Sequence, residues 1–191
     1  MEIGLFFGSF NPIHVGHLAL AEAIAENTSL SQIWFVPSPH NPLKTKNSLL
    51  HAEDRYELVK IATEDNPKFR VSDVEFYLPQ PSYTIDTLSK LAEKFPQHKF
   101  AIIMGEDNLQ NFSKWKNHTQ IIEHYQLYVH PRPNVHKTEF HTHPNVHLLK
   151  SLPLMEISAT YIRDCIKNGK SVRYLVPDNV LGLIRLKKFY Q

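Results

Sequence analysis

Hydrophobic residues of this chain occur in short runs separated by longer amphipathic stretches. Three runs are continuously apolar, which is typical of strands buried on both faces of a sheet. They span residues 3–7, 33–36 and 100–104, and a shorter run predicts a strand at 127–129. Helical spacing of apolar residues predicts helices over 18–25, 52–63 and 84–95, one through 121–122, and two more at 158–167 and 180–186.

Regular alternation of strands and helices predicts a parallel sheet. We therefore expect an α/β protein with a Rossmann-like, doubly wound parallel sheet and helices on both faces. The chain shows no internal repeat and no long linker, so residues 1–191 are interpreted as one domain, with closing helices from about residue 158. Residues 69–76 are interpreted as extended, and the Pro- and His-rich residues 130–144 as an irregular surface loop.

Composition narrows the class of protein. A formal charge of +2 without a Lys/Arg cluster argues against a nucleic-acid partner. Apolar runs fall short of the roughly 20 residues that span a bilayer, and the N-terminus lacks a secretory pattern, so we expect no membrane association. The single cysteine, Cys165, excludes an internal disulfide and favours a cytoplasmic protein. Composition does not decide between a monomer and a homo-oligomer.

The segment from Gly8 to His17, GSFNPIHVGH, joins the first predicted strand to the first predicted helix. Glycines allow a backbone to approach a ligand closely, and a helix N-terminus presents unpaired N–H groups and a partial positive charge. Such a junction suits a polyphosphate, since ligands of open α/β sheets bind beyond the carboxyl ends of the strands. Two histidines, His14 and His17, lie on one side of this junction.

A second candidate anion site lies near the other end of the chain. In ISATYIR, Ser158 is a good N-cap and Arg163 follows it on the predicted helix. Both segments resemble motifs of the nucleotidyltransferases related to class I aminoacyl-tRNA synthetases. In that superfamily H-x-G-H and I-S-x-T-x-I-R contact the phosphates of a nucleoside triphosphate. The resemblance implies catalytic roles for His14, His17 and Arg163, and an ATP site that includes these residues with Gly8, Ser9, Phe10, Ile157, Ser158 and Thr160.

The middle of the chain narrows the resemblance. PSYTIDTL at 81–88, GEDN at 105–108 and the Trp-Lys pair at 115–116 resemble bacterial nicotinate-nucleotide adenylyltransferases. This implies that the tryptophan stacks on the pyridine ring and that a threonine hydrogen-bonds its carboxylate. An aromatic face suits a planar cationic ring, and a buried carboxylate requires several donors. The implied mononucleotide site consists of Asn11, Lys44, Tyr83, Thr84 and Trp115, with core packing as the alternative role of the tryptophan.

For the adenosine part of ATP, the resemblance assigns Asp107, beside Gly105, to recognition of the ribose, and Arg132 to the side of the site that holds the adenine. Capping of a helix is the alternative for Asp107. The resemblance also makes Lys44 a catalytic residue that supplies charge to a phosphate, although Leu43 stands where the family commonly has a histidine. Arg55 matches a family arginine, for which the alternative is an ion pair that only supports the loop.

The implied reaction joins ATP and nicotinate mononucleotide to give deamido-NAD and pyrophosphate in NAD biosynthesis. Mg²⁺ carried by the ATP phosphates is the expected cofactor, without a protein metal site. The alternatives are an adenylyltransferase for nicotinamide mononucleotide or phosphopantetheine, a cytidylyltransferase, and a nucleotide-binding regulator without catalysis. Phosphopantetheine enzymes usually have a threonine where His14 stands, which disfavours that choice.

The histidines within residues 130–147 raise the question of a zinc site. Their spacing is irregular and no cysteine accompanies them, unlike the close ligand pairs of structural zinc sites. We therefore expect solvated loop residues rather than metal ligands.

Overall fold

The computed structural model describes residues 1–39, 49–153 and 155–191. Within these residues lies a sheet of six parallel strands in the order β3-β2-β1-β4-β5-β6. The strands are β1 (Glu2–Gly8), β2 (Gln32–Pro37), β3 (Phe69–Val71), β4 (Lys99–Gly105), β5 (Gln126–His130) and β6 (Val146–Leu148). The strand order reverses beside β1, as in doubly wound sheets. The predicted fold class is confirmed.

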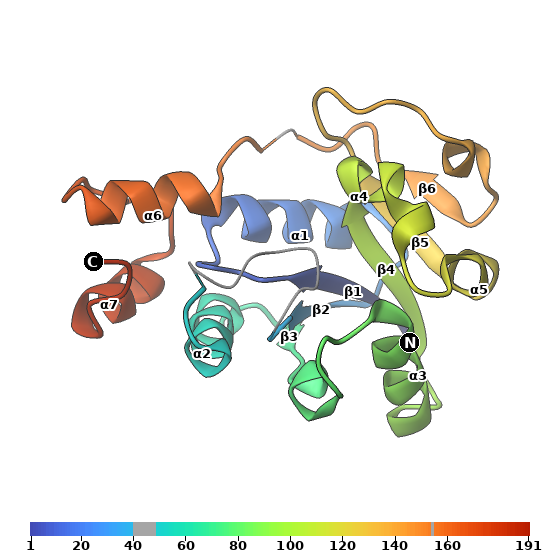
Figure 1. Ribbon diagram of the computed structural model, residues 1–191, viewed down its shortest axis with the longest axis horizontal. Helices are drawn as coiled ribbons and strands as arrows, with labels where there is room; N and C mark the ends of the chain where they lie inside the picture. Colours follow the sequence, from blue (N-terminus) through green and yellow to red (C-terminus); the bar gives the residue numbers. More distant parts are fainter. Residues whose placement is uncertain (40–48, 154) are drawn as a thin grey trace.

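The strands lie side by side with helices around them (Figure 1). The side chains of the central strands alternate between two buried faces. In β2, Ile33 and Phe35 pack on one face, and Trp34 and Val36 on the other. The first face is covered by α1 (Val15–Asn27), α2 (Ala52–Thr63), α6 (Ala159–Lys167) and α7 (Asp178–Leu186). The second is covered by α3 (Thr84–Lys94), α4 (Glu106–Gln110) and α5 (His118–His124). Burial on both faces explains why the central strands are continuously apolar.

The helices follow the predicted positions closely. Helix α2 has the predicted bounds, and α3, α6 and α7 differ from prediction by two residues or fewer at each end. Helix α1 is longer than the predicted 18–25, because its first turn includes the Gly-His part of the motif. None of the described helices is both long and apolar enough to cross a membrane.

The extended interpretation of residues 69–76 is wrong beyond Val71. Strand β3 ends there, and η2 (Val74–Tyr77) is a short 3₁₀ helix. A hydrogen bond of 2.9 Å from Phe76 N to Asp73 O closes this turn. An apolar pattern of period two does not reveal such a turn, because the turn depends on backbone hydrogen bonds.

The segment at 130–144 is more ordered than an irregular loop. It contains η4 (Glu139–Thr142), and it leads into β6, which pairs in parallel with β5. Strand β6 was not predicted, because it has three residues and the central one, His147, is exposed. A further 3₁₀ turn, η3 (Phe112–Lys114), joins α4 to α5.

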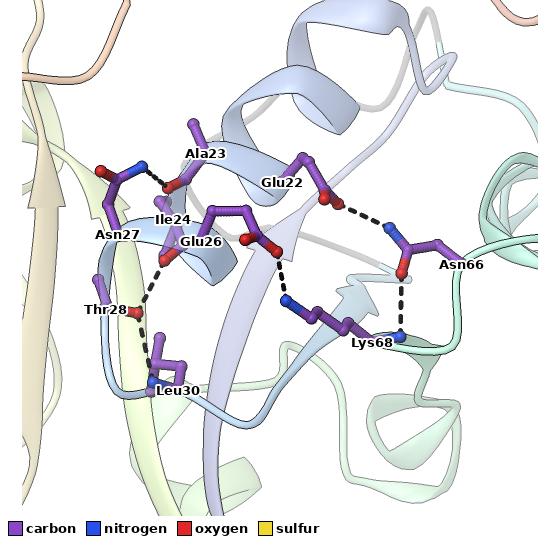
Figure 2. Close-up of polar contacts among 9 residues, drawn as sticks. All are labelled: Glu22, Ala23, Ile24, Glu26, Asn27, Thr28, Leu30, Asn66 and Lys68. Carbon is purple, nitrogen blue, oxygen red and sulfur yellow. Dashed lines mark hydrogen bonds and ion pairs between the residues drawn. The ribbon is translucent and has the colours of Figure 1, made fainter.

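Polar contacts tie the end of α1 to the segment before β3 (Figure 2). Glu22 accepts a hydrogen bond of 2.7 Å from Asn66 Nδ2, and Glu26 pairs with the ammonium group of Lys68. The Asn66 side chain in turn accepts from Lys68 N at 2.9 Å. These contacts fix the C-terminal end of α1, opposite the end at which the motif residues gather.

Candidate active site

The glycine-rich junction lies at the carboxyl edge of the sheet. Strand β1 ends at Gly8, and α1 begins after His14, which is its N-cap residue. Strand β4 pairs with β1 and ends at Gly105, so the two glycine-terminated strands end at the same edge. The structure thus brings the N-terminal motif and the GEDN segment together, although about 90 residues separate them in sequence.

The two motif histidines stack on one another. Their ring centroids are 3.6 Å apart with planes inclined by 24°, and His14 N donates to His17 Nδ1 at 3.3 Å. The close approach depends on Gly16, because a Cβ there would lie 3.1 Å from His14 Nδ1. The glycine of H-x-G-H therefore leaves room for the first histidine ring.

His14 is neutral in the free protein at neutral pH. Its residue is 5% exposed, and burial lowers its pKa to about 4, with the positive charge of Arg132 acting in the same direction. Its Nδ1 has no hydrogen-bond partner among the described residues. In the absence of a ligand, burial therefore removes the positive charge of His14.

Phe10 belongs to the core rather than to the ligand surface. Its residue is 2% exposed, and its ring meets the His17 ring edge-on at 5.1 Å between centroids. Its φ of 43° turns the loop sharply, and a Cβ on Gly8 would lie 2.8 Å from the Phe10 ring. Any contact of Phe10 with a nucleotide therefore involves its backbone.

The two phosphate motifs meet directly. Arg163 Nη1 donates to Asn11 O at 2.8 Å, and Arg163 Nη2 donates to Thr160 Oγ1 at 3.2 Å. Ser158 caps α6 as predicted, since its hydroxyl accepts from Tyr161 N at 3.1 Å. Ile157 lies against the first turn of α1, with its Cβ 3.5 Å from the Cβ position of Gly16. The fold thus joins the two predicted anion-binding segments, from opposite ends of the chain, at one edge of the sheet.

Asp107 and Arg132 lie side by side at this edge. Asp107 Oδ1 is 3.7 Å from Arg132 Nε, and both side chains are more than 40% exposed, so their attraction is screened by water. Asp107 lies in the first turn of α4, whose N-cap is Gly105, so capping is not its role. A Cβ at Gly105 would lie 2.2 Å from Asp107 Oδ1, so a side chain there would displace the exposed Asp107 carboxylate.

The residues assigned to nicotinate gather at the start of α3. Tyr83 is the N-cap residue of α3 and Thr84 its first residue. Lys116 joins this helix to the Trp115 segment, since its ammonium group lies 4.8 Å from the Tyr83 ring centroid and 2.9 Å from Asp86 Oδ2. Trp115 packs on Phe112 at the edge of the core, and it is only half-buried. Part of its side chain is therefore accessible to a ligand.

Glu75 supports this region and was missed by sequence analysis. Its residue is 2% exposed, and its carboxylate accepts three hydroxyl hydrogen bonds: from Ser38 at 2.7 Å, Ser82 at 2.8 Å and Thr87 at 2.9 Å. Ser38 follows β2, Ser82 directly precedes Tyr83, and Thr87 lies in the first turn of α3. An acidic residue inside the apolar stretch VEFYL was the available signal.

Arg55 is fully buried and holds the edge together through carbonyl oxygens. It donates to Leu50 O at 3.1 Å, Ser9 O at 2.6 Å, Ser38 O at 2.8 Å and Pro39 O at 3.0 Å. Its residue is 1% exposed, and burial lowers the pKa of the guanidinium. The ion-pair interpretation is therefore wrong, because backbone carbonyls satisfy this cation.

Lys44 and Leu43 lie outside the described residues.

Two histidines of the 130–147 segment are buried rather than solvated. His130 is 4% exposed, and burial lowers its pKa to about 4, assisted by the charge of Arg132. The His141 side chain is 4% exposed, and its Nε2 lies 3.2 Å from Glu106 Oε1. This contact attaches the segment to the start of α4. Among the described residues, no group of three or more His, Cys, Asp or Glu side chains is arranged to hold a metal.

Comparison with known proteins assigns this arrangement to a family. The model of the cytidylyltransferase-like family matches residues 5–165. A Cytophaga hutchinsonii protein described as a probable nicotinate-nucleotide adenylyltransferase is 56% identical over 190 residues, covering 100% of this chain and 98% of that protein. The chain belongs to the nicotinate-nucleotide adenylyltransferase family. A Flavobacterium psychrophilum member with the same description is 50% identical over 193 residues, covering 100% of both chains.

Solved structures of adenylyltransferases share the fold. The Plasmodium falciparum nicotinic acid mononucleotide adenylyltransferase complexed with NaAD has a TM-score of 0.82 at 18% identity, covering 99% of this chain and 97% of that one. The same enzyme complexed with APC has a TM-score of 0.78 at 18% identity, covering 99% and 96%. At this identity the likeness shows a common fold.

Arg55→Met is expected to lower the free energy of unfolding by about 3 kcal/mol, because four partly buried carbonyl oxygens lose their donors. Arg55→Lys keeps the charge but lacks the planar fork, so we expect an intermediate loss. Urea unfolding followed by circular dichroism measures both. Arg173→Met is the control, since Arg173 is exposed and its loss should change stability by less than about 0.5 kcal/mol. Wild-type stability of Arg55→Met would contradict the assigned role.

The free energy of unfolding is expected to decrease as the pH is lowered from about 6.5 to about 4. In this window His14 and His130 bind protons in the unfolded chain but not in the folded one, since their folded pKa values are about 4. Each then contributes a slope of about 1.4 kcal/mol per pH unit, with stability rising as pH rises.

Chemical denaturation at pH 5 and pH 6 tests this slope. His130→Gln should reduce it by about 1.4 kcal/mol per pH unit. His136→Gln, which removes an exposed histidine, should leave it unchanged. An identical slope in wild type and His130→Gln would show that His130 titrates normally in the folded protein.

Proposed function

We propose that this protein transfers the adenylyl group of ATP to nicotinate mononucleotide, giving deamido-NAD and pyrophosphate in NAD biosynthesis. The observation that carries the proposal is the contact between the two phosphate motifs, in which Arg163 Nη1 bonds Asn11 O at 2.8 Å beside the start of α1. The names of the relatives support the same reaction.

The chemistry requires positioning more than covalent participation by the protein. The mononucleotide phosphate attacks the α-phosphorus of ATP in line, and pyrophosphate leaves, so both reacting groups come from substrates. Fixed donors and cations that face the developing charge then supply the rate enhancement. We assign this role to His14, His17, Lys44 and Arg163.

The ATP phosphates are assigned to the junction between β1 and α1. Backbone groups of Gly8, Ser9 and Phe10 are assigned as contacts there, and the N-terminus of α1 adds a partial positive charge. Further contacts to the phosphates are assigned to the start of α6, from Ile157, Ser158, Thr160 and Arg163. Gly105, Asp107 and Arg132 are assigned to the adenosine half, at the adjacent end of β4 and after β5.

His14 changes its charge in this scheme. In the free protein its pKa is about 4, so the imidazole is neutral at pH 7. A triphosphate beside it favours the protonated form and raises the pKa. ATP binding is thereby coupled to the uptake of a proton by a ring whose Nδ1 has no partner among the described residues.

We assign Mg²⁺ to the substrate rather than to the protein. The residues that the structure describes offer no ready cluster of metal ligands. Mg²⁺ retains much of its water shell and is often bound through substrate phosphates. The bound ion would neutralise charge on the triphosphate and on the leaving pyrophosphate.

The nicotinate ring is assigned to the start of α3, where Tyr83 and Thr84 lie. Trp115 belongs to the same region, because its neighbour Lys116 contacts the Tyr83 ring. Asn11 extends the mononucleotide site toward the phosphates. The Thr84 hydroxyl and backbone N–H groups at the helix start are donors suited to a carboxylate.

We place the reaction in the cytoplasm, without a nucleic-acid or membrane partner, and leave open whether the enzyme is a homo-oligomer.

Nicotinate mononucleotide is expected to be preferred over nicotinamide mononucleotide by about tenfold to a hundredfold in kcat/KM. The amide places its own N–H₂ against a donor at the site, and an unsatisfied buried polar group costs about 1–3 kcal/mol. Pyrophosphate release from ATP, measured with each mononucleotide and with phosphopantetheine, tests this. Equal values or an amide preference would overturn the acid assignment, and ATP binding without turnover of any acceptor would favour a regulatory protein.

His17→Ala is expected to reduce kcat by about 10²–10³ while mononucleotide affinity changes little, because one transition-state donor is lost. Steady-state kinetics and calorimetric binding separate the two effects. His136→Ala serves as the matched control, since His136 is exposed on the 130–144 segment. Near-normal turnover by folded His17→Ala protein would remove His17 from the mechanism.

A further inference from the structure

The buried Glu75 carboxylate joins two regions of the candidate active site. Its Oε2 accepts hydrogen bonds from Ser38 Oγ at 2.7 Å and from Ser82 Oγ at 2.8 Å. Its Oε1 accepts from Thr87 Oγ1 at 2.9 Å. Ser38 follows β2, whereas Ser82 and Thr87 lie on either side of the start of α3. One side chain thus connects the carboxyl edge of the sheet to the region assigned to nicotinate.

The position of Glu75 is fixed by its own segment. It lies in η2, whose Val74 side chain is buried in the core on the α3 face of the sheet. Gln80 Nε2 donates to Glu75 O at 3.0 Å, which holds the backbone. Because the carboxylate is buried, it depends on the three hydroxyls in place of water. Glu75 is therefore a defined point from which these hydroxyls are held.

The Ser38 end of this network is fixed without Glu75. Ser38 N donates to Gly8 O at 2.9 Å, and Ser38 O accepts from Arg55 Nη1 at 2.8 Å. Both contacts use the backbone of Ser38, so they do not depend on the acceptor of its hydroxyl. Loss of the Glu75 carboxylate should therefore leave the edge assigned to the ATP phosphates in place.

The start of α3 depends more strongly on Glu75. Its N-cap residue, Tyr83, lacks the short oxygen-bearing side chain that usually caps a helix. Asp86 in the first turn pairs with Lys116 at 2.9 Å, but both side chains are more than 40% exposed, so water screens this attraction. The two hydroxyl contacts of this region with Glu75 are buried, where a hydrogen bond is stronger. They hold the first turn of the helix in position.

We propose that Glu75 is a positioning residue for the mononucleotide acceptor and determines how strongly the acid is preferred over the amide. The inference rests on the proposed function, because the assignment of nicotinate to Thr84 and the first N–H groups of α3 does. Discrimination between a carboxylate and an amide requires donors held at defined places. Glu75 holds these donors in place through the hydroxyls of Ser82 and Thr87, which precede and follow Thr84.

Glu75→Leu tests this role by removing the acceptor. We expect kcat/KM for nicotinate mononucleotide to fall about tenfold through KM, because the displaced donors no longer match the acid. The value for nicotinamide mononucleotide should change little, so the acid preference falls by about the same factor. The KM for ATP should stay within about twofold of wild type, as steady-state kinetics would measure. An unchanged acid preference, or an equal rise of both KM values, would overturn the inference.

Glu75→Gln separates geometry from charge. The introduced amide can accept from Ser38 and Ser82 with its oxygen and donate to Thr87 Oγ1. The Thr87 proton then turns to Tyr83 O, which lies 3.4 Å from Oγ1. Since the three contacts are kept without the charge, we expect the acid preference to stay within about threefold of wild type. A loss as large as in Glu75→Leu would contradict positioning, because it would show that the charge itself acts on the substrate.

Thr87→Val tests the same network with a smaller change, which matters if Glu75→Leu does not fold. It removes one of the three hydroxyls, and we expect the acid preference to fall about threefold to tenfold. Thr63→Val is the matched control. Thr63 is also buried, but its hydroxyl donates to Val59 O at 2.9 Å within its own helix, α2. Thr63→Val should keep the wild-type preference, and a wild-type preference in Thr87→Val would refute the role of the network.

Hydrogen exchange distinguishes this inference from the proposed function. If folded wild-type protein turns over no mononucleotide, the proposed function fails. The amides of Asp86 and Thr87, which bond Tyr83 O at 3.0 Å and 3.1 Å, still report how firmly the start of α3 is held. Exchange at least about tenfold faster in Glu75→Leu, and unchanged in Thr63→Val, supports the positioning role. Equal exchange in Glu75→Leu and wild type refutes it.

Discussion

The buried Arg55 guanidinium is the interaction on which the geometry of the candidate active site most depends. It projects from α2 and bonds carbonyl oxygens of segments that follow two adjacent strands, Ser9 after β1 and Ser38 after β2. Carbonyls do not neutralise its charge, so the cost of desolvation is offset only when the donors are satisfied together. The edge assigned to the phosphates is therefore held in one arrangement in the free protein, and such preorganisation favours electrostatic catalysis.

Other buried polar groups at this edge follow the same principle. The Glu75 carboxylate is satisfied by three hydroxyls, and Asn11 by donors from Leu50, Arg163 and Tyr190. Each network joins segments that are distant in sequence, so the site is rigid without being part of the apolar core. His14 differs, because it is buried and neutral in the free protein.

The sheet order explains where the two halves of the dinucleotide product would lie. Strand β1 has β2 on one side and β4 on the other, and the direction of winding reverses there. The phosphate motifs occupy this central position. The residues assigned to nicotinate follow η2 and η3 on one face, and Asp107 and Arg132, assigned to the adenosine part, follow β4 and β5. In the proposed reaction, the reacting phosphates would lie at the junction after β1, beside these residues.

The sequence by itself determined strands β1, β2, β4 and β5, the main helices and the two motifs assigned to phosphates, because these depend on short-range periodicity and local turn chemistry. It also indicated the family, through residues that lie close together within each motif. Tertiary structure alone decided the partners of Arg55, the neutral state of His14, the burial of His130 and His141, and the contact of Tyr190 with Asn11. Burial and hydrogen bonding across long separations cannot be deduced from residue type, since His141 and the exposed His136 differ in surroundings and not in local pattern. Strand β6 was decided in the same way, because three residues form a strand there only by pairing with β5.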